Sequence, residues 1–363
     1  MMKYQMREAF FACTTPYQII GAISIVKNTK ITADLYIFGM FTGYERVAEV
    51  IRGQNIFENV YAVDCTDFQF TKKSLALKQI LFCRKAVSVF LPDRVAYKTC
   101  YTTSRAHVKT LMIHELRRRN PNMDYVLYED GTGTYRPGTL AIRTSEKRAK
   151  LEKLLGWSMM EPEKVHVMAY EPGLVECSPV ISIHPVEQMP RIDWQNDGQM
   201  IGEVFGVREE DCIHEKVILF DTVRCGDAEM DEHFDACYSL FLKHFGEDNV
   251  ICKPHPRSVY KSKSGVRVYE SSGIPVEALY AMMPDIEDRL LVSCTSTATF
   301  TPRLLFGKEP VLIDINNLVQ KNASAADCNA ILQKLIAMYK DKSRILYPNT
   351  MEELQEMIDR LGR

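Results

Sequence analysis

The sequence contains no run of about 18 uninterrupted apolar residues, the length that a helix needs to cross a bilayer. Its first apolar stretch is interrupted by Thr14, Thr15, Pro16 and Gln18, and no small-residue cleavage site follows it. We therefore expect neither a membrane-spanning helix nor a signal peptide.

The motifs of common metal and cofactor sites are also missing. The chain has no DxD, no HExxH and no paired histidines at ligand spacing, so a metal-dependent nucleotide-sugar enzyme would have to find its ligands elsewhere. No GxGxxG follows the first strand-like segment, which argues against dinucleotide binding. We expect no metal site and no cofactor.

Disulfide and zinc patterns are absent as well. Eleven cysteines are scattered singly, without a CxxC pair or a Cys/His cluster at zinc spacing. They are expected to be reduced thiols, and this predicts a cytoplasmic location.

What the chain does have is the composition of a globular protein and an uneven charge. Its 363 residues, 46% hydrophobic and 25% charged, fit two domains. The net charge of −2 conceals twelve Lys and Arg against two acids in 70–119, and thirteen acids against four bases in 200–250. Because the chain as a whole is not basic, we expect no nucleic-acid partner.

Strand-like and helical segments alternate along most of the chain, which predicts parallel sheets with helices on their faces. The expected strands are 10–13, 34–38, 59–63, 123–128, 216–221, 249–253, 289–294 and 310–315. The expected helices begin near Pro16 and Ser296 and lie near 44–54, 72–90, 104–119, 228–245, 275–283, 324–340 and 350–361.

Residues 171–200 hold four prolines and little helical periodicity, so we interpret them as the linker region. We predict an α/β protein of two Rossmann-like domains, 1–188 and 189–363, facing across a cleft. Packing of the terminal helix on the first domain is left open.

Three polar stretches follow predicted strands, where parallel α/β sheets bind ligands. In YEDGTGTY (128–135), Glu129 and Asp130 precede a glycine-rich turn. Two acids in a solvated turn would give the same pattern, whereas a strand end is also a common place to present reactive groups.

The second stretch is ICKPHPRS (251–258), which places Lys253, His255 and Arg257 on a loop stiffened by prolines. A cationic cluster of this kind suits a phosphate, and a histidine can protonate a phosphate leaving group. A rigid solvated turn is the alternative.

The third stretch is LVSCTSTATF (291–300), an apolar strand followed by hydroxyl residues. Thr295 or Ser296 can cap a following helix without any ligand. Helix starts also bind phosphates through free N–H groups, and the surplus of hydroxyls favours that use.

In order, the acidic pair plus glycine at 129–131, His-Pro at 255–256 and Ser-Thr at 296–297 resemble the D/E-D/E-G, HP and S-S/T motifs of bacterial sialyltransferases. The opening FFACTTPYQIIGA also looks like the amino terminus of glycosyltransferase family 52, the lipooligosaccharide and capsule sialyltransferases. The resemblance implies a GT-B-like fold with an acceptor-side amino domain. It further implies a carboxyl domain that binds CMP-sialic acid, an inverting and metal-independent reaction, and a homodimer.

The resemblance also implies roles for individual residues. Glu129, supported by Asp130, would be the general base that deprotonates the acceptor hydroxyl, with Asp221 as a rival. His255 would contact or protonate the departing CMP phosphate. The other expected nucleotide-binding residues are Lys253, Pro254, Arg257, Ser293, Thr295, Ser296 and Thr297. The expected acceptor-binding residues are Thr15, Tyr17, Gln18, Gly131 and Thr132.

The basic stretch 72–119 has two interpretations. A basic, partly amphipathic helix could lie on the anionic inner face of the cytoplasmic membrane, where a glycolipid acceptor is presented. A solvated helix face with its apolar side on the core would have the same pattern.

Two other functions fit the same motifs. One is a CDP-polyol phosphotransferase of the teichoic-acid type, and the other is a non-catalytic protein that binds a sugar or nucleotide. If the protein is a sialyltransferase, we expect its acceptor to be a galactose-terminated glycan.

Overall fold

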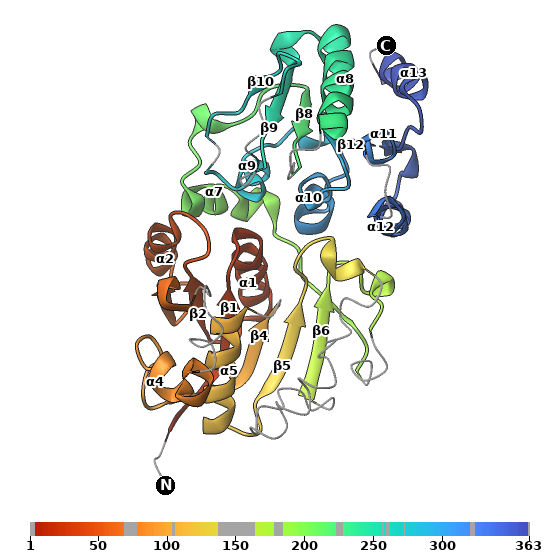
Figure 1. Ribbon diagram of the computed structural model, residues 1–363. Helices are drawn as coiled ribbons and strands as arrows, with labels where there is room; N and C mark the ends of the chain where they lie inside the picture. The colour runs from red at the N-terminus through yellow and green to blue at the C-terminus, as the bar shows by residue number, and fades with distance from the viewer. Residues whose placement is uncertain are drawn as a thin grey trace. The chain divides into compact units, whose positions relative to one another are not determined.

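The computed structural model describes residues 4–68, 78–103, 106–136, 164–177, 184–222, 228–255, 258, 262–271, 273–319 and 324–361. The chain forms two compact units (Figure 1). The first comprises Met1–Asp130 and Pro137–Ile192, and the second comprises Gly131–Arg136 and Asp193–Arg363. The expected domain boundary was 188/189, and the main division of the chain lies at 192/193. A six-residue segment of the first half also belongs to the second unit.

The first unit contains one parallel sheet with strand order β3-β2-β1-β4-β5-β6-β7. Its strands are β1 (Gln5–Cys13), β2 (Ala33–Phe38), β3 (Asn59–Val63), β4 (Val95–Thr102), β5 (Asp124–Tyr128), β6 (Val165–Ala169) and β7 (Glu187–Gln188). The second half of β1 is completely buried, as expected for a central strand covered on both faces.

The helices of the first unit are α1 (Pro16–Thr29), α2 (Tyr44–Gly53), α4 (Cys83–Val87) and α5 (His107–Arg119). Helix α1 begins as the sequence predicts, because Thr15 accepts a hydrogen bond from the Gln18 amide (3.3 Å) and Pro16 occupies the first turn.

The sequence analysis differs from the first unit in two respects. Strands β4 and β6 were not predicted, although β4 pairs with both β1 and β5 near the centre of the sheet. The long basic helix expected near 72–90 is interrupted in its described part: residues 78–81 and 83–87 are helical, and the backbone breaks between them at Phe82 (φ −113°, ψ 38°). Residues 69–77 lie outside the described residues.

The second unit contains a parallel sheet with order β10-β9-β8-β11-β12-β13. Its strands are β8 (Val217–Phe220), β9 (Val250–Lys253), β10 (Arg267–Val268), β11 (Leu290–Ser293), β12 (Val311–Asp314) and β13 (Ile345–Leu346). The four longest lie where the sequence predicts strands, and every residue of β8, β9 and β11 is buried.

The helices of the second unit are α7 (Trp194–Phe205), α8 (Ala228–Phe245), α9 (Val276–Ala281), α10 (Thr297–Phe306), α11 (Asn316–Val319), α12 (Ser324–Met338) and α13 (Met351–Leu361). Helix α7 lies in the expected linker and was not predicted. The apolar side chains Leu354 and Ile358 of α13 are buried in the core of this unit, against α8. The terminal helix therefore packs within the second unit.

Counted within each unit, the second sheet has the Rossmann strand order 3-2-1-4-5-6, and the first has the same order with a seventh strand added at the edge. The expected α/β class with two Rossmann-like units, a GT-B-like fold, is confirmed. In this topology the strand order reverses between β1 and β4, and again between β8 and β11, and ligands bind at the carboxyl ends of the strands beside such a reversal. No helix among the described residues is long and apolar enough to cross a membrane.

Candidate functional site

The first unit gathers the predicted acceptor-side residues at the carboxyl edge of its sheet. Glu129 follows β5 and is completely buried. Its Oε1 accepts a hydrogen bond from the Tyr17 hydroxyl (3.0 Å), and its Oε2 accepts one from the Tyr170 amide (2.8 Å). Glu129 thus ties α1 to the chain that leaves β6, which is a structural use of its carboxylate.

Asp130 is more accessible than Glu129 and is held by α1. Both of its carboxylate oxygens accept from the Gln18 Nε2 at 3.0 Å. Gln18 is itself fixed, because its Oε1 accepts from the Thr14 amide at 2.8 Å. The acidic pair is therefore oriented by side chains of α1 and is not a solvated turn.

Lys109 of α5 completes this arrangement and was not singled out from the sequence. Its side chain is buried, and its Nζ donates to the Ala12 carbonyl (3.1 Å), the Gln18 Oε1 (3.4 Å) and the Thr103 hydroxyl (3.3 Å). Burial lowers the pKa of Lys109, and this is opposed by nearby acidic groups that include Asp130. Lys109 thus supports Asp130 through Gln18.

The chain passes into the second unit at Gly131. Gly131 has a φ of +78°, and a Cβ at this position would lie 2.6 Å from the Cγ2 of Thr297. The next residue, Thr132, places its Oγ1 at 2.6 Å from the Oγ1 of Thr297. Gly131 and Thr132, expected on the acceptor side, therefore lie beside the first residue of α10, where the phosphate was expected.

The turn before α10 is built as the sequence predicts, and it also contains a strained residue. Ser296 caps the helix and accepts from the Ala298 amide, while the buried Ser293 hydroxyl accepts from the Ser296 amide (3.2 Å). Thr295 has a φ of +46°, which is uncommon for a β-branched residue and is often found at functional sites.

Asp314, at the end of β12, holds Thr295 in this conformation. Its Oδ2 accepts from both the amide and the hydroxyl of Thr295, each at 2.8 Å. Burial raises the pKa of Asp314 to about 6, although hydrogen bonds from Asn316 and Thr295 oppose the shift. The strained turn therefore depends on an acid whose pKa is raised to about 6.

Lys253 ends β9 and is almost completely buried. Its Nζ donates to the Ile274 carbonyl at 3.0 Å and lies 4.6 Å from the centre of the Tyr269 ring. Burial lowers the pKa of Lys253 to about 8, with Glu277 opposing the shift. Pro254 and His255 follow, and the His255 carbonyl accepts from the Ser258 amide. Arg257 lies outside the described residues.

Asp221 follows β8, the strand between β9 and β11. Its amide donates to the Lys253 carbonyl (3.2 Å), and its Oδ2 accepts from the Ser258 hydroxyl (3.0 Å). Asp221 therefore lies at the reversal of strand order in the second unit, beside the loop that carries His255.

The carboxyl ends of β8, β9 and β11 thus lie at one edge of the second sheet. Each is followed or ended by a group that can bind an anion or transfer a proton. The edge offers a cation at Lys253, a carboxylate at Asp221 and the capped start of α10 with Thr297. Among the described residues, no three His, Cys, Asp or Glu side chains are grouped so that they could hold a metal ion. Metal independence stays a prediction.

Comparisons with known proteins find likenesses only in structure. No protein-family model and no curated protein matches the chain. It resembles the calicheamicin glycosyltransferase CalG4 with 12% identity and a TM-score of 0.49, over 99% of this chain and 90% of that one. It also resembles the UDP-GlcNAc 2-epimerase of Neisseria meningitidis with 11% identity and a TM-score of 0.44, over 98% and 99% of the two chains.

A third likeness is to UGT89C1 of Arabidopsis thaliana complexed with UDP-L-rhamnose, with 9% identity and a TM-score of 0.40 over the whole of both chains. These low scores carry no argument about activity. A function for this chain has to rest on its own sequence motifs and site geometry.

Proposed function

We propose that the protein is a metal-independent, inverting glycosyltransferase that moves sialic acid from CMP-sialic acid to a galactose-terminated glycan. The observation that carries the proposal is the shared edge of the second unit, where Asp221 follows β8, Lys253 ends β9 and α10 begins after β11. The ordered motifs of the sequence support the choice of donor.

The donor phosphate is assigned to the start of α10. Cleavage of the bond between the anomeric carbon and the phosphate oxygen leaves CMP with an additional negative charge. Backbone N–H groups and hydroxyls at a helix start stabilise that charge, and a nearby cation adds to it. Ser296, Thr297 and Lys253 are the residues that supply these groups, and His255 supplies a proton or a hydrogen bond to the departing phosphate.

The general base removes the proton of the acceptor hydroxyl as its oxygen attacks the anomeric carbon. The sequence favours Glu129, but its complete burial and its bonds to Tyr17 and Tyr170 favour a supporting role. Asp221 lies in the same unit as the proposed phosphate site, directly after the strand that pairs with the strand of Lys253. We therefore assign the proton transfer to Asp221, with Asp130 as the alternative within the acidic pair.

Donor selection tests the proposal. Thermal unfolding is measured with CMP, CDP, UDP or GDP, all in EDTA, and we expect CMP to give the largest stabilisation. CMP-sialic acid and CDP-glycerol are then incubated separately with a galactose-terminated acceptor. Release of CMP from CMP-sialic acid together with a sialylated product supports the proposal. Turnover of CDP-glycerol alone, or no turnover of either donor, contradicts it.

A further inference from the structure

The surface around α4 carries large apolar side chains beside cations. Leu81, Phe82 and Val89 are 62%, 60% and 77% exposed, although they fall within nine residues of one another. Arg84 and Lys85, between them in the sequence, are also exposed. We call these five residues the α4 face. Exposed apolar side chains scattered singly need no explanation, whereas contiguous apolar patches mark interaction surfaces.

The opposite side of α4 explains why these residues point outward. Cys83, Val87 and Leu91 recur every four residues and belong to the core of the first unit. The Cys83 thiol also donates to the Leu111 carbonyl of α5 at 3.2 Å. These contacts hold α4 with its other side, which carries Arg84 and Lys85, toward solvent.

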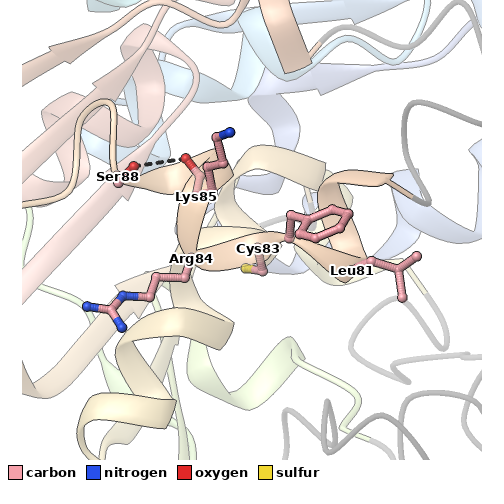
Figure 2. Close-up of a pocket in the computed structure, with 6 residues that line it drawn as sticks. Leu81, Cys83, Arg84, Lys85 and Ser88 are labelled. Carbon is pink, nitrogen blue, oxygen red and sulfur yellow. Dashed lines mark hydrogen bonds between the residues drawn. The ribbon is translucent and has the colours of Figure 1, made fainter.

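The α4 face includes a hollow of about 450 Å³ (Figure 2). Leu81, Arg84 and Lys85 extend away from the helical backbone around it, and the Ser88 hydroxyl donates to the Lys85 carbonyl at 2.9 Å. The hollow is lined by Leu81, Phe82, Cys83, Arg84, Lys85 and Ser88. Apolar and cationic groups therefore border the same depression.

The described residues 78–92 carry Lys78, Arg84 and Lys85 and no acid. The Glu115 carboxylate of α5 lies near Cys83, but it is buried and paired with Arg118 and Arg119. Exposed apolar side chains next to cations are typical of segments that lie in the headgroup region of an anionic bilayer. Cations attract the lipid phosphates while the apolar side chains enter the acyl boundary.

We propose that the α4 face docks the protein on the surface of a membrane that contains anionic lipids. Phe82, Leu81 and Val89 insert at the interface, and Arg84 and Lys85 contact lipid phosphates. This surface belongs to the first unit alone and is independent of the proposed glycosyl transfer, so either assignment can fail without the other.

Binding to vesicles tests the docking. The whole protein is sedimented with phosphatidylcholine vesicles, with or without about 30 mol% phosphatidylglycerol. We expect binding to the anionic vesicles only, and we expect it to weaken as NaCl rises from about 0.05 M to about 0.5 M, because salt screens the attraction. The double variant Arg84→Gln/Lys85→Gln is expected to lower the partition coefficient about 25-fold, at about fivefold for each cation removed.

A second variant tests the apolar part of the contact. Phe82→Ser is expected to lower partitioning about tenfold, since a large apolar side chain no longer leaves water. Matched controls are Lys340→Gln/Lys342→Gln for charge and Tyr347→Ser for an exposed ring, all in the second unit. Unchanged binding by these controls supports the assignment to the α4 face.

Three results overturn the proposal: no binding of the unaltered protein to anionic vesicles, equal binding to neutral vesicles, or unchanged binding by both α4-face variants. Light scattering is measured on the same proteins. A dimer that dissociates in Phe82→Ser, without any vesicle binding, would identify a second copy of this chain as the occupant and would also overturn it.

Discussion

The hydroxyls of Thr132 and Thr297 lie 2.6 Å apart, although 165 residues separate them in the chain. One follows the acidic pair of YEDGTGTY, and the other is the first residue of α10. The turn that follows the acidic pair thus meets the start of α10 within the second unit. The hydroxyl contact fixes the loop after β5 against the proposed phosphate site.

The close approach at Gly131 predicts a sensitive position. Gly131→Ala requires a positive φ for alanine and places a Cβ 2.6 Å from the Thr297 Cγ2. We expect a loss of about 1–3 kcal/mol in the free energy of unfolding, measured by urea denaturation. Gly133→Ala is the control, because a Cβ there meets nothing within 4 Å. Thr297→Ser in the Gly131→Ala background removes the Cγ2 and should recover part of the lost stability. Equal stability of Gly131→Ala and Gly133→Ala would contradict the prediction.

The buried position of Lys253 predicts a pH effect on donor binding. Its pKa is lowered to about 8, so its positive charge is lost as the pH rises through that value. If the charge binds the donor phosphate, the KM for CMP-sialic acid should rise above pH 8 while kcat changes less. Lys253→Arg keeps its charge over this range and should remove the rise. If KM still rises above pH 8 in Lys253→Arg, the pH dependence of donor binding comes from another group.

The assignment of the general base predicts unequal effects of three carboxylates. Asp221→Asn should lower kcat for CMP release by at least about 100-fold while CMP still binds, as measured by calorimetry. Glu129→Gln should act more weakly and mainly through stability, and the exposed Asp359→Asn should change neither quantity. A larger loss of kcat in Asp130→Asn or Glu129→Gln than in Asp221→Asn would move the base to the acidic pair.

The buried Lys109 predicts a structural cost that does not depend on activity. Lys109→Met leaves the Ala12 carbonyl and the Gln18 Oε1 without their cationic donor. We expect a loss of about 1–3 kcal/mol in the free energy of unfolding. Lys98→Met, an exposed lysine of β4, should stay within about 0.5 kcal/mol of the unaltered protein. Equal stability of the two variants would show that the Lys109 contacts add nothing.

Asp314 predicts a change of stability with pH. Because its pKa in the folded protein is raised to about 6 from an ordinary value of 3.8, its contribution is complete below pH 3.8 and is lost as the pH rises through 6. Thermal unfolding is measured between pH 4 and 7. Asp314→Asn should remove this fall of stability with rising pH, whatever its effect on absolute stability. The exposed Asp93→Asn is the control. An unchanged slope in Asp314→Asn would contradict the assignment.

The sequence predicts best those elements whose signals are local. Helices α1 and α10 begin where expected because Thr15 and Ser296 cap them, and the buried strands β8 and β11 are short apolar runs. Helix α7 is missed because two glycines disfavour a helix in isolation. In the fold a Cβ at Gly198 would lie 2.5 Å from the Ala281 carbonyl oxygen, so tertiary packing decides.

The candidate site is predicted in its parts but not in its connections. The strand-end rule places Asp130, Asp221 and Lys253 on the carboxyl edges of their sheets. It does not show that Lys109, on a helix with many polar residues, is buried beside Gln18, or that Asp314 holds Thr295. Those contacts join segments far apart in the chain, and local patterns do not encode them.

The six residues Gly131–Arg136 also impose an order on folding. They are synthesised long before α10, yet they pack in the unit that α10 helps to form. At about 5–20 residues per second, the ribosome needs roughly ten to thirty seconds to add the 165 residues from Gly133 to Thr297. During that interval the first sheet can form, whereas Thr297, which Thr132 contacts, has not yet been synthesised. The second unit therefore completes its core only after α10 has been added.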